Sequence, residues 1–328
     1  MLRATATDWP TRLFCLILSV LPLHASPVGA APTGEVQPAA TGRNVASALL
    51  LDATRAGERI VAVGERGIVL YSDDDGGSWL QAAVPVDPTL TSVVFADAEH
   101  GWITGHDATI LATTDGGLTW QVQFRDPDLD VPLLAMYFAD MNTGMAVGGR
   151  GNMFRTRDGG KTWVNEVLLT GDEFDGHLFG IGKADSGSLF IASERGVLFR
   201  SDDAGVTWQE LASPYNGSFF GLAFPGHGRI VAYAMLGNIA VSSDNGDSWR
   251  MVPTGTDKSL MSGTVMADGT LVIAGLDGAV LVSHDAGETF LSMPQADRRK
   301  VSRLLPTRDG GWLAFGDGGV HRIMLNIN

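Results

Sequence analysis

Acidic residues recur along this sequence in one short pattern. Each copy has a Ser or Thr, an Asp two residues later, a Gly two residues after the Asp, and then a second Ser or Thr before an aromatic residue, as in "TTDGGLTW". A single copy could be a calcium loop, a catalytic carboxylate or a tight turn. The aspartates concerned are Asp74, Asp115, Asp158, Asp203, Asp244 and Asp285.

The number of copies favours the turn. The aromatic residues that end the pattern lie 41 to 45 residues apart, a spacing typical of repeat architectures. A calcium loop needs several more oxygen ligands at alternating positions, whereas "TTDGGLTW" offers one carboxylate. Asp supplies an acceptor for turn amides, and Gly adopts positive φ. We therefore interpret the six aspartates as structural turn acids without a catalytic or metal-binding role.

The elements around each turn read as short strands. Residues 91–124 contain four segments rich in Val, Ile, Phe, Trp and Thr, separated by turn signals, which predicts a four-stranded antiparallel meander. The aromatic residue after each turn begins the fourth strand. We expect these residues to be buried at equivalent positions: Trp79, Trp120, Trp163, Trp208, Trp249 and Phe290.

A seventh unit near the C-terminus has three segments and lacks a complete fourth strand. Because a lone four-stranded unit cannot bury its faces, the seven units predict an all-β, seven-bladed β-propeller with Asp-box turns over residues 47–328. Within residues 31–46 we expect a strand near residues 34–46 that pairs with the last blade and closes the ring. The Pro- and Gly-rich composition of this segment leaves a linker as the alternative.

The N-terminus has the features of an export signal. Arg3 and Arg12 precede the apolar run "LFCLILSVLPL", which is too short to span a bilayer and is followed by small residues. We predict a signal peptide over residues 1–30, with a membrane anchor or a misassigned start as alternatives. The one cysteine, Cys15, lies inside this run. A net charge of −14 opposes binding to nucleic acid.

The Asp-box pattern, together with "VGERGIVLYS" and "FADAEHGWITG", resembles the propellers of the photosystem II stability and assembly factor family. The "G-x-R-G" turn favours this family over sialidases and sortilin-like receptors, which also carry Asp boxes. The resemblance implies an exported, periplasmic or extracellular scaffold, on the lumen side in a photosynthetic organism. It also implies a monomer without enzymatic activity or cofactor that assists assembly of an envelope membrane protein.

Three arginines share one offset from the Asp box. Arg66, Arg150 and Arg195 each lie six residues before the first Ser or Thr of the box. The other units place Asp107, Leu236 and Asp277 at this offset, and Asp317 at about the same place. The resemblance implies that the arginines line one mouth of the tunnel and hold an acidic or C-terminal segment of a partner.

Two alternatives remain open for these arginines and for the activity. Each arginine could instead pair with a neighbouring acid such as Glu65 or Glu194. Arg150, which lacks such a neighbour, is then the best single candidate for a ligand contact. A sialidase-like glycosidase would need a tyrosine nucleophile with a glutamate partner, and only Tyr215 is not explained by strand packing. The basic stretch "ADRRKVSR" is typical of solvated surface.

Overall fold

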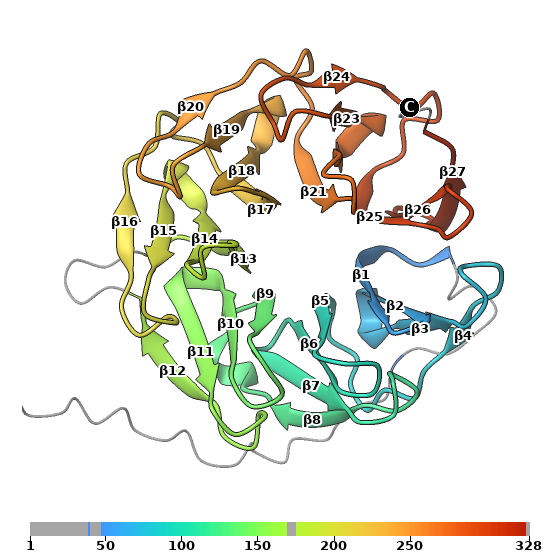
Figure 1. Ribbon diagram of the computed structural model, residues 1–328. Coiled ribbons are helices and arrows are strands. Elements are labelled where there is room, and N and C mark those ends of the chain that lie inside the picture. The colour runs from blue at the N-terminus through green and yellow to red at the C-terminus, as the bar shows by residue number, and fades with distance from the viewer. Residues whose placement is uncertain (1–38, 40–46, 169–174, 326–328) are drawn as a thin grey trace, which may run out of the picture.

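Seven antiparallel sheets surround a common axis in the computed structural model, which describes residues 39, 47–168 and 175–325 (Figure 1). The first blade contains β1 (Leu50–Ala56), β2 (Arg59–Gly64), β3 (Val69–Ser72) and β4 (Leu80–Gln81), ordered from the centre outward. The same order recurs in every blade, so β1, β5, β9, β13, β17, β21 and β25 form the inner ring.

Blades two to four have four strands each. Their bounds are β5 (Leu90–Phe95), β6 (Gly101–Gly105), β7 (Thr109–Thr113) and β8 (Gln121–Phe124); β9 (Leu133–Phe138), β10 (Gly144–Gly148), β11 (Asn152–Thr156) and β12 (Val164–Val167); and β13 (Leu178–Lys183), β14 (Leu189–Ser193), β15 (Leu198–Ser201) and β16 (Gln209–Leu211).

Blades five and six also have four strands, and blade seven has three. Their bounds are β17 (Phe219–Gly226), β18 (Arg229–Ala234), β19 (Ile239–Ser242) and β20 (Arg250–Met251); β21 (Leu260–Val265), β22 (Leu271–Gly275), β23 (Val280–Ser283) and β24 (Leu291–Ser292); and β25 (Val301–Pro306), β26 (Trp312–Gly316) and β27 (Gly319–Ile323). The predicted all-β propeller, including its incomplete last unit, is confirmed.

Single 3₁₀ turns are the helical elements of the described residues. They are η2 (Glu65–Gly67), η3 (Pro127–Leu129), η4 (Gly149–Gly151), η5 (Glu194–Gly196), η6 (Met235–Gly237) and η7 (Leu276–Gly278). Except for η3, each lies between the second and third strands of its blade, and we call this connection the 2–3 turn. No helix in the described ranges is long and apolar enough to cross a membrane.

The core is divided among the blade interfaces. Alternate residues of the second strand face opposite neighbours, as expected for a period of two. In β2, Ile60 and Ala62 pack in a cluster with residues of blade seven, whereas Val61 and Val63 pack with blade two. Seven such clusters join the seven pairs of adjacent blades. Each blade is therefore buried by both of its neighbours.

The Asp-box aromatic residues lie at these interfaces, between their own blade and the preceding one, but not all are buried. Trp120 and Trp163 are 3% and 2% exposed, whereas Trp79, Trp208, Trp249 and Phe290 are half-buried. The expectation of six equivalent buried positions was therefore wrong in four blades. The two buried rings precede the four-residue outer strands β8 and β12, whereas the other four rings precede outer strands of two or three residues.

The ring closes by packing of blade one on blade seven. β1 lies against β25 and β26, the Arg303 Nε donates to the Ala53 carbonyl at 3.2 Å, and the Arg55 Nη2 donates to the Pro306 carbonyl at 2.9 Å. The predicted closing strand lies outside the described residues except for Ala39, whose amide donates to the Val84 carbonyl at 3.2 Å. The signal-peptide prediction for residues 1–30 also lies outside them.

Candidate functional site

The Asp-box carboxylates are occupied by their own turns. In blade two, the Asp115 Oδ1 accepts from the Thr113 hydroxyl at 2.7 Å and from the Thr119 amide at 3.0 Å. The Asp115 Oδ2 accepts from the Thr119 hydroxyl at 2.5 Å, and the Thr113 Oγ1 accepts from the Gly117 amide at 3.0 Å. The same hydroxyl and amide contacts recur at Asp74, Asp158, Asp203, Asp244 and Asp285.

These contacts keep the carboxylates ionised. Hydrogen bonds from the hydroxyls of Ser78 and Thr207, and then from the amides of the same residues, lower the pKa of Asp74 and Asp203 to about 2. At Asp115, partial burial opposes this effect, but the hydrogen bonds from Thr119 and its neighbours still lower the pKa. Across the described ranges, no three His, Cys, Asp or Glu side chains are placed to hold a metal ion.

The 2–3 turns place the three arginines in one backbone conformation. Arg66, Arg150 and Arg195 have φ values of 54°, 54° and 59°, in the left-handed region that side chains other than Gly seldom adopt. Leu236 and Asp277 have φ values of 55° and 54°. Because the 2–3 turn and the Asp-box turn lie at opposite ends of the third strand, the arginines lie on the face opposite the Asp boxes. We call this surface the arginine face.

Each arginine turn packs on the chain that enters the next blade, and the turns of Arg66 and Arg150 are also hydrogen-bonded to it. The Gly67 amide donates to the Pro88 carbonyl at 2.9 Å, and the Gly151 amide donates to the Gly176 carbonyl at 2.8 Å. As a result, η2 packs against β5, η4 against β13 and η5 against β17. Backbone contacts fix these turns, so the arginine side chains are not needed to hold them.

The adjacent glutamates brace the backbone and do not pair with the arginines. The Glu65 Oε1 accepts from the Leu49 amide at 3.0 Å, and the Glu194 Oε2 accepts from the His177 amide at 3.1 Å. Pairing with these neighbours, the alternative drawn from the sequence, is therefore wrong. Their side chains satisfy amides at the entry to the inner strand, a contact that sequence adjacency does not reveal.

Two of the arginines pair with acids from the preceding connection. Arg195 lies 2.7 Å from Asp175, and Arg150 lies 3.9 Å from Asp130. Both arginine side chains are more than 60% exposed, and such pairs are worth at most about 1 kcal/mol. Among the described residues, Arg66 has no carboxylate within 4 Å. Of the three arginines, Arg66 rather than Arg150 is therefore the one that is not paired with a carboxylate.

The aspartates at the equivalent positions are neutralised internally. Asp107 accepts from Arg125 at 2.8 Å, and Asp277 lies 3.3 Å from Arg298 and 3.5 Å from Lys258. In blade seven the turn is shorter, because Gly316 pairs directly with Gly319. Asp317 consequently occupies the position of Glu65, one residue before that of the arginines.

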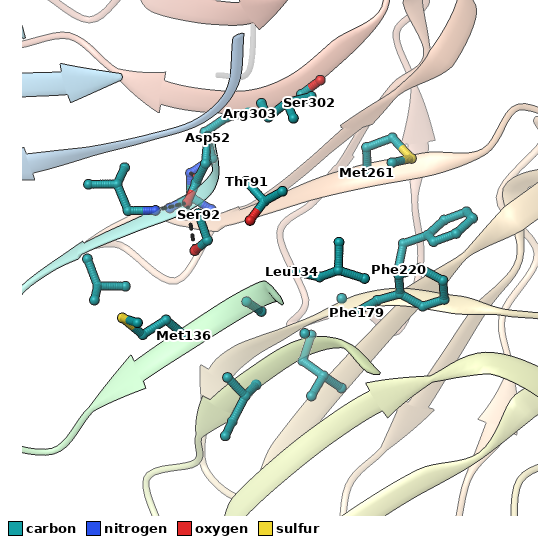
Figure 2. A pocket seen from close by; sticks show the side chains of 18 of the residues that line it. Asp52, Thr91, Ser92, Leu134, Met136, Phe179, Phe220, Met261, Ser302 and Arg303 are labelled. Carbon is teal, nitrogen blue, oxygen red and sulfur yellow. Dashed lines mark hydrogen bonds and ion pairs between the residues drawn. The ribbon is translucent and has the colours of Figure 1, made fainter. Parts of the chain in front are cut away.

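A cavity of about 420 Å³ lies at the centre of the ring, bounded by all seven inner strands. None of the three arginines lines it. Its one carboxylate belongs to Asp52, which accepts from the Ala53 and Val93 amides at 2.9 Å and from the Ser92 hydroxyl at 3.1 Å (Figure 2). Burial raises the pKa of Asp52, although Arg303 and these hydrogen bonds oppose the shift. The repeat alignment could have indicated Asp52, because no other inner strand has an acid at this position.

Three of the four tyrosines do not have the environment of a glycosidase nucleophile. Burial raises the pKa of Tyr137, Tyr215 and Tyr233 above its ordinary value, whereas a phenolate nucleophile requires the opposite shift. The Tyr215 hydroxyl donates to the Met235 carbonyl at 3.3 Å. Tyr215, which strand packing could not explain, therefore contacts the 2–3 turn of blade five.

Comparisons with known proteins agree with this architecture. Two solved structures, described as YCF48 bound to D1 peptide and YCF48 from Cyanidioschyzon merolae, superpose with TM-scores of 0.68 and 0.69 at 21% and 19% identity. Both comparisons cover 88% of this chain, and they cover 100% and 98% of the solved chains. At these identities the likeness shows the fold.

Sequence relatives match over short stretches. The chain is 47% identical over 45 residues to the chloroplastic photosystem II stability/assembly factor HCF136 of Guillardia theta, which is 13% of this chain and 11% of that protein. It is 41% identical over 49 residues to the photosystem II assembly lipoprotein Ycf48 of Synechocystis sp., 15% of this chain and 14% of that protein. These matches thus span a small part of either relative.

The family model described as photosynthesis system II assembly factor YCF48 matches residues 71–250, from the third strand of blade one to the fourth strand of blade five. This match covers more than half of the chain and includes five of the six Asp boxes and two of the three arginine turns. The chain therefore belongs to the YCF48 family of photosystem II assembly factors.

Proposed function

We propose that this chain is an exported, non-enzymatic scaffold that binds an acidic or C-terminal segment of a membrane protein and assists its assembly or stability. Arg66, Arg150 and Arg195 hold the segment. The family match supports an assembly role, and the solved relative described as YCF48 bound to D1 peptide supports a peptide ligand on this fold. Because the family description names photosystem II, its subunits are the first partners to test in a photosynthetic organism.

The observation that carries the proposal is the exposure of three guanidiniums on turns that do not need them. Their backbone positions are fixed by the next blade, so little conformational entropy of the main chain is lost on binding. The exposed contacts of Arg150 and Arg195 with Asp130 and Asp175 are weak, and a ligand carboxylate can replace them. A guanidinium binds carboxylate through two parallel hydrogen bonds, which adds directional specificity.

The test is capture of membrane proteins from the native envelope, with identification by mass spectrometry. The triple variant Arg66→Ala, Arg150→Ala, Arg195→Ala should lose most capture at physiological salt while its circular dichroism spectrum stays unchanged. A matched control removes three exposed cations of the opposite face, Arg157→Ala, Lys161→Ala and Arg308→Ala, and alters net charge equally. Equal capture by the two variants would contradict the proposal.

A second comparison separates a bidentate clamp from a general positive field. Replacing the three arginines by lysine keeps the charge but removes the planar arrangement of donors. We expect the triple lysine variant to capture much less partner than the native chain. Full capture by the lysine variant would show that positive charge alone suffices. It would contradict recognition of a carboxylate through two parallel hydrogen bonds from each guanidinium.

A further inference from the structure

One wall of the central cavity is apolar. The second residues of the inner strands in four consecutive blades, Leu134, Phe179, Phe220 and Met261, line it side by side and are half-buried (Figure 2). The rings of Phe179 and Phe220 meet edge to face with centroids 5.3 Å apart. Large apolar side chains that remain accessible inside a cavity are typical of ligand sites, because a ligand can remove them from water.

The opposite wall is polar and carries a surplus positive charge. Asp52 and Arg303 lie there 3.5 Å apart, and Asp52 is further satisfied by two amides and a hydroxyl. Lys300 also lines the cavity and is half-buried, and no carboxylate of the described residues lies within 4 Å of its Nζ. Since the one acid of the cavity is already occupied, the unpaired cation favours an anionic ligand.

The apolar wall adjoins the arginine face. The turns of Arg150 and Arg195 pack against β13 and β17, the strands that carry Phe179 and Phe220 near their first residues. These strands begin at the arginine face, so the aromatic pair lies at the end of the cavity nearest the arginines. A ligand segment bound by Arg150 and Arg195 can therefore also place a side chain against Phe179 and Phe220.

From these observations we propose that the cavity mouth is a second binding subsite, which accepts an apolar side chain with an adjoining carboxylate. The apolar group packs on Leu134, Phe179, Phe220 and Met261, and the carboxylate pairs with Lys300. This inference rests on the proposed function, since it assigns the cavity to the same partner segment. It adds a requirement for an aromatic or aliphatic residue beside the acid, which exposed arginines alone cannot impose.

A small probe tests the subsite without knowledge of the partner. 3-Phenylpropionate combines a phenyl ring with a carboxylate, 3-phenylpropanamide keeps the ring without the charge, and propionate keeps the charge without the ring. Met136 and Met261 are residues of the cavity lining, whereas Met141 and Met324 are exposed elsewhere. We expect saturable shifts of the first two in methyl NMR spectra with 3-phenylpropionate, and unchanged signals from the other two.

The probe series also tests the role of Lys300. The amide and propionate should each bind about tenfold more weakly than 3-phenylpropionate, and Lys300→Gln should remove the preference for the acid over the amide. Phe220→Leu, which keeps an apolar wall, should retain that preference. Equal binding of acid and amide, an unchanged preference in Lys300→Gln, or unshifted Met136 and Met261 signals would overturn the proposal.

Capture experiments separate this subsite from the arginine face. The double variant Met261→Gln, Lys300→Gln should lower partner capture about tenfold while leaving Arg66, Arg150 and Arg195 unchanged. If it captures fully while the triple arginine variant fails, the cavity inference is wrong and the proposed function stands. If the double variant fails and the triple arginine variant captures fully, the cavity binds the partner and the arginine face does not.

Discussion

The Asp-box turn and the 2–3 turn of the same blade each reverse the chain between two neighbouring strands, but different contacts hold them in place. Six Asp-box turns use the same side-chain hydrogen bonds, in which one carboxylate receives a hydroxyl on either side and an amide. The 2–3 turns share a left-handed residue with φ between 54° and 59° but fill it with Arg, Leu or Asp. In these turns, backbone contacts with the next blade hold the conformation.

This difference indicates where the fold leaves room for recognition. A turn closed by its own side chain cannot change that side chain without losing the hydrogen bonds of the turn. A turn closed by backbone contacts can carry any residue that tolerates positive φ, at a cost of about 1–2 kcal/mol relative to Gly. Binding residues are therefore expected on the arginine face, and substitutions on the two faces should have opposite consequences.

The largest loss of stability is expected at the aromatic residue that follows a turn. Trp120 is 3% exposed and packs between blades one and two, and its indole donates to the Gly117 carbonyl at 3.1 Å. Replacing it by Ala should lower the free energy of unfolding by about 3–5 kcal/mol in chemical denaturation. Phe290→Ala, at a half-buried position, should cost clearly less. A loss below about 1 kcal/mol for Trp120→Ala would show that the ring is not part of the core.

A smaller loss is expected for the turn acid itself. Asp115→Asn keeps the shape of the side chain but weakens the hydrogen bonds from Thr113 and Thr119, and should cost about 1 kcal/mol. Partner capture should be unchanged, since this carboxylate faces away from the arginine face. If capture is abolished while the denaturation curve stays the same, Asp115 has a functional role and the structural interpretation is wrong.

Acid titration provides a finer test of the same turns. The folded pKa of Asp74 and Asp203 is about 2, below the ordinary value of 3.8, so the unfolded chain binds more protons in the interval between these values. Their stabilising contribution is complete above about pH 4 and is lost as the pH falls through about 2. Asp203→Asn should therefore lose less stability than the native chain between pH 5 and pH 2. Parallel pH curves for the two proteins would contradict the role assigned to these hydrogen bonds.

The fold followed from the sequence because repetition averages out local ambiguity. Six copies of Ser/Thr-x-Asp and the alternation in segments such as residues 91–124 predicted the blades and their order. The surroundings of each unit were less predictable. Trp120 is buried and Trp79 is half-buried, although each packs between its own blade and the preceding one, and the motif does not encode this difference.

The candidate site was predicted in part. The offset from the Asp box placed Arg66, Arg150 and Arg195 at one backbone position, but their partners lie in other connections. Asp130 and Asp175 precede their arginines by 20 residues, so it is the folding of each blade that brings the pairs together. The contribution of Asp52 and Lys300 to the cavity likewise arises because blades one and seven meet, which local sequence cannot show.

The smallest effect on stability is expected at Leu236. This position also gives the most direct test of the difference between Asp-box turns and 2–3 turns. This side chain is 62% exposed and already adopts φ of 55°, the conformation of the arginine positions. Leu236→Arg should change the free energy of unfolding by less than about 0.5 kcal/mol, because neither burial nor backbone strain is altered. It adds a fourth guanidinium in the blade next to that of Arg195 and should increase partner capture, whereas Leu236→Asp should decrease it. The measurement is capture by both variants at two salt concentrations, with the denaturation curve as the control. Equal capture by the two variants would mean that the charge at position 236 does not affect partner binding.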